Sequence, residues 1–420
     1  MTTITVDTTY TVGAGGDYPS IPAAITAISD YHIQAGVILT IQLLAEDHTI
    51  TSSVVLSHPY GCQIKICGAT PQPLTFDSFV SSSSFGLGNH EVTLKFNSVV
   101  GVNVGDYITC TNLAGSGVYK CLAGTWETLA VDVGNNTLTL KNTSQISTLP
   151  TVGITAGSFQ RETSPVRAIG CTGFVVKADF GDGSGQDTGL QDLCIVGDAT
   201  PLLVGIIVEY GRFLCMARCK TVNFGRYGVY GIYNATLNGL GSISCSNGSN
   251  GFYMLNGAVG QFVSGISTGN KGIGFVASNN GTLATTNCNA SGNGTGYYVT
   301  HGSGALCENS QVICNKTRGM FNDINSTIDA EGSTVQHNLY GLKTSTNSVT
   351  IFENTLCDNS DITDIETSNK GTTYADGSTY TTEVTSGSSC LVTTPTASDD
   401  LMVACLTATV HVKTPTVIPV

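Results

Sequence analysis

Three glutamates recur at nearly constant spacing in the C-terminal half of the sequence. Glu308, Glu331 and Glu353 are separated by 23 and 22 residues, and Asp329 stands two residues before Glu331. A glycosidase needs two carboxyl groups, about 5 Å apart for retention or about 6.5–9.5 Å apart for inversion. If one spacing is one turn of a coil, neighbouring glutamates stack about 4.8 Å apart. Carboxylates at so short a distance raise one another's pKa, and a general acid requires a raised pKa. These four residues are therefore the candidate catalytic residues.

Two other interpretations of the same column stay open. The glutamates could form a solvated stripe, or they could meet Lys343 or Arg318 of another chain in a trimer. Between Glu209 and Glu308 the sequence contains no Asp or Glu at all. The central repeats therefore lack an acid for general acid–base chemistry, and the non-catalytic interpretations are favoured.

The coil is indicated by a glycine–apolar pair that recurs every 22 or 23 residues. A fixed period in this range is typical of a solenoid. The repeats are poor in helix formers and rich in Gly, Asn, Ser, Thr and Val, which predicts coils of short strands. An asparagine precedes most of the glycines by three or four residues, with Asn223 offset by one. We expect stacked asparagine amides to bond along the rod at a left-handed corner, with glycine supplying positive φ or close backbone approach. The glycines are Gly205, Gly228, Gly251, Gly274, Gly296, Gly319 and Gly341, and the expected ladder is Asn247, Asn270, Asn293, Asn315 and Asn338.

The two residues after each glycine predict two columns, because side chains alternate along a strand. The first position is apolar throughout and is predicted to point into the rod. The second is predicted to point outward and carries Tyr230, Tyr253, Tyr298 and Phe321. Exposed aromatic columns are seldom bare, so we expect either a subunit interface, which is favoured, or a platform for sugar rings. The inward column comprises Val229, Phe252, Phe275, Tyr297, Met320 and Leu342.

The composition excludes several classes of protein. Charged residues make up 11% and hydrophobic residues 41%, which suits a repetitive β structure and argues against disorder. The net charge of −13, without a run of Lys or Arg, argues against a nucleic-acid partner. The sequence offers no signal peptide and no bilayer-spanning stretch, so membrane insertion is not expected. Fifteen cysteines without zinc-site spacing are expected to be reduced, buried thiols, and no metal or cofactor is expected.

The chain is predicted to have four parts. Residues 1–85 form an N-terminal cap and the first coils, with a helix expected within Val12–Asp30 after Pro19-Ser20. Residues 86–165 form an inserted β-rich module of paired strands, and its Trp126 is either a core residue or, less favoured, a sugar contact. Residues 166–369 form the parallel β-helix, and residues 370–420 close the rod or join three chains.

Several motifs resemble those of right-handed parallel β-helices of the pectate-lyase-like type, and of bacteriophage tail spikes and fibres in particular. The cap residues are Gly15, Gly16, Asp17, Tyr18, Ile21, Ala24, Ile25, His58, Pro59, Gly61 and Gly68, and the insert reads VGDYI followed by VD and NNTLTL. The resemblance implies a homotrimeric virion protein, made in the host cytoplasm, that recognises a bacterial surface polysaccharide during host attachment. It also implies contact with other tail or baseplate proteins through the N-terminus.

Two enzymatic alternatives accompany this interpretation. A tail-spike depolymerase, either a glycoside hydrolase or a lyase, would use the glutamate column on capsule or lipopolysaccharide. A secreted pectinase-like enzyme is disfavoured, because no signal peptide is seen and the arginines of the central repeats (Arg212, Arg218 and Arg226) lack the aspartates that accompany them in those families. A protein that binds without cleaving is the favoured function.

Overall fold

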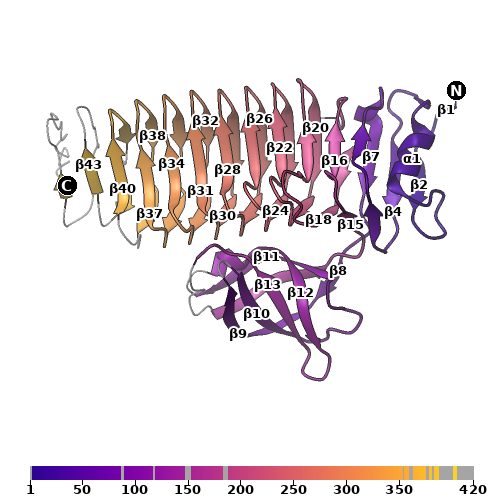
Figure 1. Ribbon diagram of the computed structural model, residues 1–420, viewed down its shortest axis with the longest axis horizontal. Helices are drawn as coiled ribbons and strands as arrows, with labels where there is room; N and C mark the ends of the chain where they lie inside the picture. Colours follow the sequence, from indigo (N-terminus) through magenta and orange to yellow (C-terminus); the bar gives the residue numbers. More distant parts are fainter. Residues whose placement is uncertain are drawn as a thin grey trace, which may run out of the picture.

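The computed structural model describes residues 2–86, 89–116, 119–146, 153–182, 188–352, 354–358, 363–374, 378–380, 383–386 and 401–403. These residues form a parallel β-helix with one α-helix at its N-terminal end and an antiparallel module beside the rod (Figure 1). The fold class predicted from the Asn–Gly repeat is confirmed. Within the described part of the chain, no helix has the length and apolar character needed to cross a membrane.

Three parallel sheets form the walls of the rod, and each coil passes from sheet 1 to sheet 2 to sheet 3. Sheet 1 comprises β2 (Thr8–Val12), β4 (Leu39–Leu43), β7 (Ile64–Cys67), β17 (Gly189–Gln191), β20 (Phe213–Ala217), β23 (Thr236–Leu240), β26 (Val259–Val263), β29 (Thr282–Thr286), β32 (Gly304–Leu306), β35 (Thr327–Asp329), β38 (Val349–Ile351) and β41 (Thr372–Tyr374). Sheet 2 comprises β5 (His48–Ile50), β15 (Pro165–Ala168), β18 (Cys194–Gly197), β21 (Lys220–Val222), β24 (Ile243–Cys245), β27 (Ile266–Thr268), β30 (Asn289–Ser291), β33 (Gln311–Ile313), β36 (Thr334–Gln336), β39 (Leu356–Asp358) and β42 (Thr379–Tyr380). Sheet 3 comprises β6 (Val54–Leu56), β16 (Phe174–Val176), β19 (Ile206–Val208), β22 (Val229–Ile232), β25 (Phe252–Leu255), β28 (Ile273–Ser278), β31 (Thr295–Thr300), β34 (Arg318–Asn322), β37 (Tyr340–Thr344), β40 (Thr363–Ser368), β43 (Glu383–Ser386) and β44 (Leu401–Val403).

The interior of the rod is a continuous stack of apolar side chains. The predicted inward column pairs in register along sheet 3, and every member is at most 1% exposed. Phe275 stacks on Phe252 and on Tyr297, with ring centroids 5.0 Å apart in both pairs. Offset stacking at this spacing adds to the burial of apolar area, so the repeat itself stabilises the core.

The predicted asparagine ladder is present at the corner between sheets 2 and 3. Asn247 Nδ2 donates to Asn270 Oδ1 at 2.8 Å, and Asn270 Nδ2 donates to Asn293 Oδ1 at 2.9 Å. Asn315 continues the ladder by donating to Asn338 Oδ1 at 3.0 Å. All five side chains are buried, so these bonds satisfy amides that would otherwise be costly to bury.

The backbone at this corner differs from the expectation in one respect. The left-handed residue is the one before each ladder asparagine, for example Ser246 at φ 59° and Cys314 at φ 57°. Asn223, the residue with the offset, is itself left-handed at φ 60°. The repeat glycines instead allow the backbones of neighbouring coils to lie close together. A Cβ on Gly274 would lie only 2.7 Å from the carbonyl oxygen of Gly296. Position in the corner, rather than asparagine itself, therefore selects the left-handed conformation.

Helix α1 (Ile21–Ile28) covers the N-terminal end of the rod, as predicted (Figure 1). Ser20 Oγ caps it by accepting from Ala23 N–H, and Ile21, Ala24 and Ile28 are buried. The short parallel pair β1 (Thr3–Ile4) and β3 (His32–Ile33) lies beside it. The helix shields strand edges that would otherwise pair with other chains.

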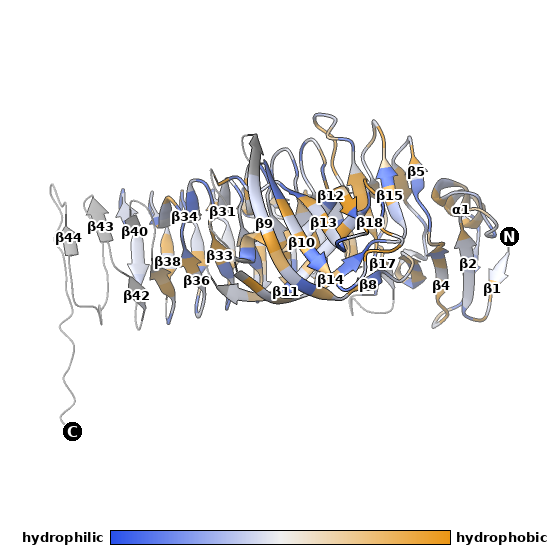
Figure 2. Ribbon diagram, turned by 90° about the horizontal axis from the view of Figure 1, so that it is seen from below, coloured by the Kyte–Doolittle hydropathy of each residue, from blue (hydrophilic) through white to orange (hydrophobic). Residues whose placement is uncertain are grey.

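The inserted module is a seven-stranded antiparallel sheet that leaves the rod between β7 and β15. It begins at Gln72, earlier than the residue 86 expected from the sequence, because β8 and most of β9 already pair with its later strands. Figure 2 shows it lying across sheet 2 of the rod. Its strands are β8 (Gln72–Leu74), β9 (Phe76–Gly86), β10 (Asn89–Phe96), β11 (Tyr107–Ser116), β12 (Gly124–Asp132), β13 (Thr137–Asn142) and β14 (Gly153–Arg161). Short 3-10 turns lie at Gly61–Gln63 (η1) and Tyr119–Leu122 (η2).

Candidate functional site: a groove between the module and the rod

The module is packed onto the outer face of sheet 2. Its apolar core is continuous with outward side chains of the rod, including Val222, Ile243 and Cys245. These outward residues are apolar where the module covers them, and each is at most 2% exposed. Burial of this face fixes the module against the rod.

A buried ion pair holds the C-terminal end of the module to the rod. Lys220 Nζ lies 3.2 Å from Glu162 Oε2, and both side chains are 2% exposed. Thr109 donates its hydroxyl to the other carboxylate oxygen at 2.6 Å. Burial alone would lower the pKa of Lys220, but the neighbouring Glu162 carboxylate outweighs it and leaves that pKa raised. Each partner depends on the other, because removal of one would leave the other buried without its partner.

Hydrogen bonds repeat this attachment along the next coils. Thr268 Oγ1 donates to Ala123 O at 2.7 Å, and Asn289 Nδ2 donates to Lys120 O at 2.9 Å. Further along, Gln145 N–H donates to Gly292 O at 2.7 Å. The module is thus bonded at successive coils, and the space it encloses with the rod has two fixed walls.

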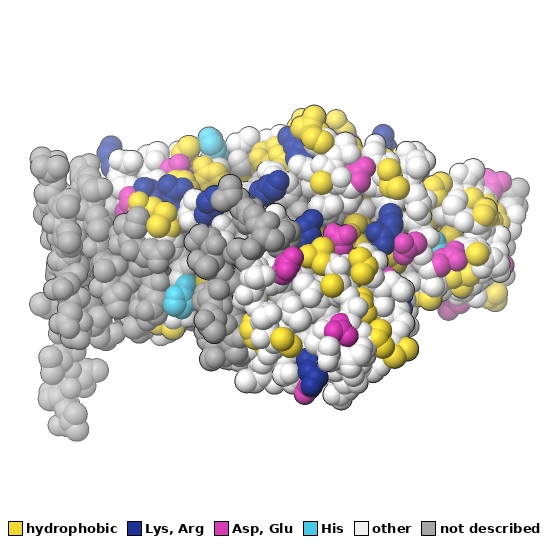
Figure 3. Space-filling model, turned by 60° about the horizontal axis from the view of Figure 1, so that its bottom comes forward, with side chains coloured by type: hydrophobic (Ala, Val, Ile, Leu, Met, Phe, Trp, Pro, Cys, Tyr) yellow, Lys and Arg dark blue, Asp and Glu magenta, His cyan; other side chains and the backbone are white. Residues whose placement is uncertain are grey.

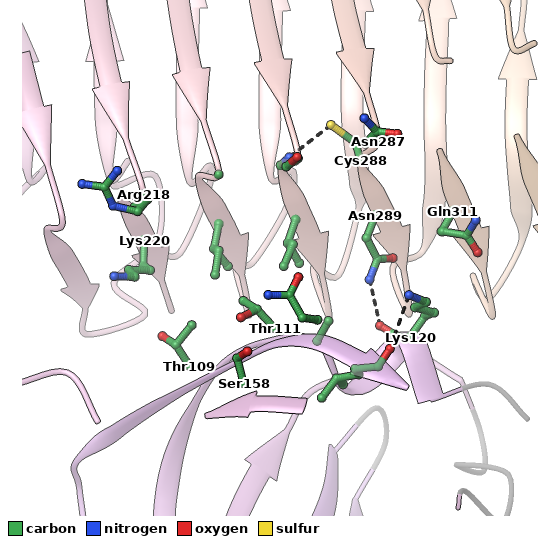
Figure 4. Close-up of a pocket in the computed structure, with 18 of the residues that line it drawn as sticks. Thr109, Thr111, Lys120, Ser158, Arg218, Lys220, Asn287, Cys288, Asn289 and Gln311 are labelled. Atoms are coloured by element: carbon green, nitrogen blue, oxygen red, sulfur yellow. Dashed lines mark hydrogen bonds between the residues drawn. The ribbon is translucent and has the colours of Figure 1, made fainter. Parts of the chain in front are cut away.

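That space is an open groove of about 610 Å³. Figure 4 shows Thr109, Thr111 and Ser158 directed from the module toward the rod, and Arg218, Asn289 and Gln311 on the opposite wall. The rod wall runs from β21 to β33, four steps of about 4.8 Å, or roughly 19 Å along the axis. The full lining is Thr109, Thr111, Asn112, Leu113, Lys120, Ala123, Ser158 and Gln160 from the module, with Arg218, Lys220, Gly241, Ile243, Ser264, Gly265, Ile266, Asn287, Cys288, Asn289 and Gln311 from the rod.

The rod side of the groove follows the corner between sheets 1 and 2. The left-handed residues of four successive coils line it: Arg218, Gly241, Ser264 and Asn287. A left-handed corner favours small or polar residues, so backbone and short polar groups face the groove here. The fold therefore places hydrogen-bonding groups at a regular interval along an open channel.

The charged groups lining the groove are all cationic. Lys120 stands at the β30–β33 end, and Arg218 and Lys220 stand at the β21 end (Figure 4). Arg218 is bonded to Asp192 at 2.7 Å through two of its nitrogens. Among the described lining residues there is no Asp or Glu. Figure 3 shows further Lys and Arg side chains on the rod beside the module.

The predicted glutamate column lies on the same corner, just beyond the groove. Asn287 N–H donates to Glu308 O at 3.0 Å, and Asn309 N–H donates to Glu331 O at 2.9 Å. These bonds place Glu308 and Glu331 on neighbouring coils, half-buried and exposed respectively. Asp329 aligns with Leu306 and Ile351 instead. Its carboxylate accepts from Glu331 N–H at 3.4 Å, and Glu353 lies outside the described residues.

The outward aromatic column is in register on sheet 3, but its members differ in exposure. Tyr230 is only 9% exposed, because Tyr227 packs against it at 5.0 Å and against Tyr253 at 5.1 Å. Tyr230 is thus covered within its own chain and is not available to a sugar ring or a partner, contrary to the expectation. Tyr253, Tyr298 and Phe321 remain half-exposed.

Tyr298 and Phe321 stack at 5.0 Å, and the Arg318 guanidinium lies over the Phe321 ring at 4.5 Å. The next residue of the column is Lys343, which pairs with Glu366 of the same chain at 2.6 Å. Arg318 and Lys343, which one of the open interpretations paired with glutamates of another chain, therefore have partners within this one.

Trp126 is a core residue of the module. Its side chain is 2% exposed, and its indole N–H donates to Leu122 O at 2.8 Å. A buried, bonded indole cannot stack on a sugar, so the less favoured glycan role of Trp126 is wrong.

The cysteines are small buried residues. Of the thirteen described, all but Cys62 are buried. Burial raises the pKa of Cys245 and of Cys288 to about 12, which suppresses the reactive thiolate at neutral pH. No group of three or more His, Cys, Asp or Glu that could hold a metal ion is found among the described residues.

Sequence reasoning did not find the groove, because its two walls come from segments more than fifty residues apart. One signal was present: the coils that line the rod side fall almost entirely within the acid-free stretch between Glu209 and Glu308. Taken alone, that stretch argued against general acid–base chemistry in the central repeats. Because the module lies over these coils, the same stretch indicates that the rod wall facing the module has few or no carboxylates.

Comparison with known proteins yields structural similarity only. No family model and no curated protein sequence matches the chain. The solved A-module of the Azotobacter vinelandii mannuronan C-5 epimerase AlgE4 is similar, with a TM-score of 0.51 at 11% identity, covering 90% of this chain and 89% of that one. The A-module of AlgE6 from the same organism gives a TM-score of 0.48 at 12% identity, covering 94% and 95%. At this identity the likeness to AlgE4 shows a shared parallel β-helix fold.

Proposed function

We propose that this protein is a bacteriophage tail-fibre or tail-spike protein that binds a bacterial surface polysaccharide in the groove between its module and its rod. The observation that carries the proposal is the lining of the groove, where hydroxyls and amides lie in a channel of about 610 Å³ open to solvent. Sugar hydroxyls both donate and accept hydrogen bonds, so Ser, Thr, Asn and Gln side chains suit them. The shared fold with an enzyme named for mannuronan supports the same class of ligand.

The geometry favours binding over cleavage. In a glycosidase, two carboxyl groups flank the bond that is broken. Glu308 and Glu331 are absent from the lining of the groove, whose charged groups are cations. A polysaccharide held in the groove would therefore meet hydrogen-bonding groups and positive charge, and the depolymerase remains the second candidate.

The test blocks the groove and leaves the fold intact. Ser158 is an exposed residue of β14 in the groove wall, and Ser81 is an exposed residue of β9 in the same sheet but outside the lining. We expect Ser158→Trp to abolish retention of a purified bacterial capsular polysaccharide that the wild-type protein binds, and Ser81→Trp to leave retention unchanged. Equal retention by both variants would show that the polysaccharide binds outside the groove.

The trimer is a separate part of the proposal. The half-exposed Tyr298 and Phe321, which pair on adjacent coils of sheet 3, support a subunit interface, and Tyr253 lies in the same column two coils before Tyr298. Sedimentation equilibrium should give three times the chain mass of 43.5 kDa. A single chain at micromolar concentration would contradict the interface, without bearing on the groove.

A further inference from the structure

We propose that the corner between sheets 3 and 1 carries a second glycan-binding site, in which a pyranose ring packs against Tyr210 and Tyr233 and the neighbouring sugar units bond to exposed asparagine amides. This corner does not border sheet 2, so it lies on the side of the rod away from the module (Figure 1). The site is separate from the groove, and binding there does not depend on the groove.

The corner has one backbone conformation that repeats in every coil from β19 to β40. Its first residue is left-handed in each coil, with φ between 49° and 56°. Backbone bonds hold successive corners in register, and Gly211 N–H, for example, donates to Tyr233 O at 2.8 Å. Asparagine tolerates this conformation, whereas a bulky side chain raises its energy. The residues at this position are Tyr210, Tyr233, Asn256, Asn279, His301, Ile324, Thr346 and Asn369.

Burial does not explain why tyrosine occupies this position twice. Tyr210 is 70% exposed and Tyr233 is 44% exposed, whereas Tyr230 on sheet 3 is only 9% exposed. The two corner rings stack with their centroids 5.2 Å apart and their planes 17° apart, so they present one continuous aromatic surface to solvent. Residues that are both strained and exposed are typical of binding sites, because neither feature stabilises the fold.

Exposed amides continue the corner on the next two coils. Asn279 Nδ2 donates to Asn256 Oδ1 at 3.1 Å at the surface. No other hydrogen bond of these two side chains is found among the described residues, so Asn256 Nδ2 and Asn279 Oδ1 remain available as donor and acceptor. From Tyr210 to Asn279 there are three steps of about 4.8 Å, or roughly 14 Å along the rod. A glycan lying along the corner would therefore meet an aromatic surface and then hydrogen-bonding groups.

This combination suits an uncharged sugar. The C–H face of a pyranose is apolar and packs on an aromatic ring, while the hydroxyls at its edge both donate and accept hydrogen bonds. Residues 227–270 contain no Asp, Glu, Lys, Arg or His, and Glu209 and Arg212 beside Tyr210 are of opposite charge. A charged sugar would therefore lose water at this corner without gaining a counter-charge. Two rings are also too small an apolar surface for a stable protein interface, which favours a glycan as the occupant.

The experiment measures saturation transfer in NMR spectra from the full chain to neutral tetrasaccharides. The probes are cellotetraose, maltotetraose and N-acetylchitotetraose at millimolar concentration, because so exposed a site should have a Kd on the order of 1 mM and is too weak to retain a polysaccharide alone. Every protein carries Ser158→Trp, which blocks the groove, so that the groove contributes no transfer. We expect transfer to at least one probe, and weaker transfer to tetragalacturonate, which carries a charge on each unit.

The variant that removes the rings and relieves the backbone is Tyr210→Asn/Tyr233→Asn, which gives these two coils the residue found at Asn256 and Asn279. It should reduce saturation transfer about tenfold or more, whereas its midpoint of denaturant unfolding should stay the same or rise. Tyr210→Phe/Tyr233→Phe keeps the rings and should retain the transfer. Tyr340→Asn, at a half-exposed tyrosine of sheet 3 outside this corner, should not change it.

Each other result would overturn the inference. Unchanged transfer by the asparagine variant would place sugar binding elsewhere on the surface, and no transfer to any probe would show that the corner does not bind neutral glycans. A lower unfolding midpoint with unchanged transfer would make the stack a structural feature, and a smaller sedimentation mass with unchanged transfer would assign it to a subunit contact. Equal transfer to tetragalacturonate would contradict an uncharged ligand. None of these results bears on the groove, whose test is the loss of polysaccharide retention on Ser158→Trp.

Discussion

The interior of the rod and its junction with the module are built in opposite ways. In the interior, one arrangement repeats coil after coil, as in the Phe252–Phe275–Tyr297 stack and the asparagine ladder. At the junction several coils contact the module, but each does so through different residues, and contacts such as Lys220–Glu162 and Thr268–Ala123 each occur once. The repeat produces a scaffold in which neighbouring coils make equivalent contacts. The unique contacts produce a groove at one place along it.

This difference predicts which parts of the molecule a substitution should affect. A defect in the interior affects a coil and its two neighbours, since a solenoid is stabilised by nearest-neighbour interfaces. A defect at the junction affects the position of the whole module and therefore the groove. Stability and ligand binding should respond separately to the two kinds of variant.

The largest effect is expected from breaking the junction ion pair. Lys220→Ala leaves the Glu162 carboxylate buried without its counter-charge, which should lower the free energy of unfolding by about 3–5 kcal/mol. Denaturant unfolding followed by circular dichroism measures it. The double variant Lys220→Met/Glu162→Leu should recover most of the loss, because apolar residues of similar size often replace a buried pair without penalty. A Lys220→Ala protein as stable as wild type would show that the module is held by its apolar face alone.

A smaller loss is expected from one rung of the ladder. Asn270 donates to Asn293, and its Oδ1 accepts from both the side chain and the backbone of Asn247. Asn270→Ala leaves several buried polar groups unsatisfied and should lower the free energy of unfolding by about 2–3 kcal/mol. The exposed Asn97→Ala should change it by less than about 0.5 kcal/mol. Polysaccharide binding by folded Asn270→Ala should persist, and its loss would contradict the separation of scaffold from groove.

The same contrast explains what the sequence could reveal. A period of 22 or 23 residues identified the rod, its ladder and the inward column ending at Leu342, because a repeated contact leaves a repeated residue. Lys220 and Glu162 lie 58 residues apart and occur in no pattern, so no periodicity indicates their pairing. The covering of Tyr230 by Tyr227 was missed for a similar reason, since the residue directly before the repeat glycine differs from one coil to the next and is tyrosine only at Tyr227 and Tyr340. The site could not be predicted because its contacts are not repeated.

Acid should loosen the N-terminal cap before the rod. His58 Nε2 bonds Ile28 O at 2.9 Å and its Nδ1 accepts from Tyr60 N–H at 3.0 Å, which requires a neutral ring. Burial lowers the pKa of His58, so the folded state binds its proton less readily than the unfolded state does. The stabilisation is therefore complete above about pH 6.5 and is lost as pH falls through the lowered pKa. Hydrogen exchange in α1 should rise on acidification in wild type, and His58→Gln should remove that pH dependence whereas His337→Asn, at an exposed histidine, should not.

The smallest effect is expected from the glutamate column, and it bears on the second candidate function. Glu308 and Glu331 occupy neighbouring coils, half-buried and exposed, so Glu308→Gln/Glu331→Gln removes a mild repulsion and should change the free energy of unfolding by no more than about 0.5 kcal/mol. Reducing ends released from a bound polysaccharide provide the functional measurement. We expect no release by wild type or by the double variant, because the groove positions a ligand among cations and amides. If wild type releases reducing ends and the equally stable double variant does not, Glu308 and Glu331 would be catalytic residues. The binding groove, which Asn287 lines, would then lie directly beside a catalytic site at Glu308 on the same corner of the rod.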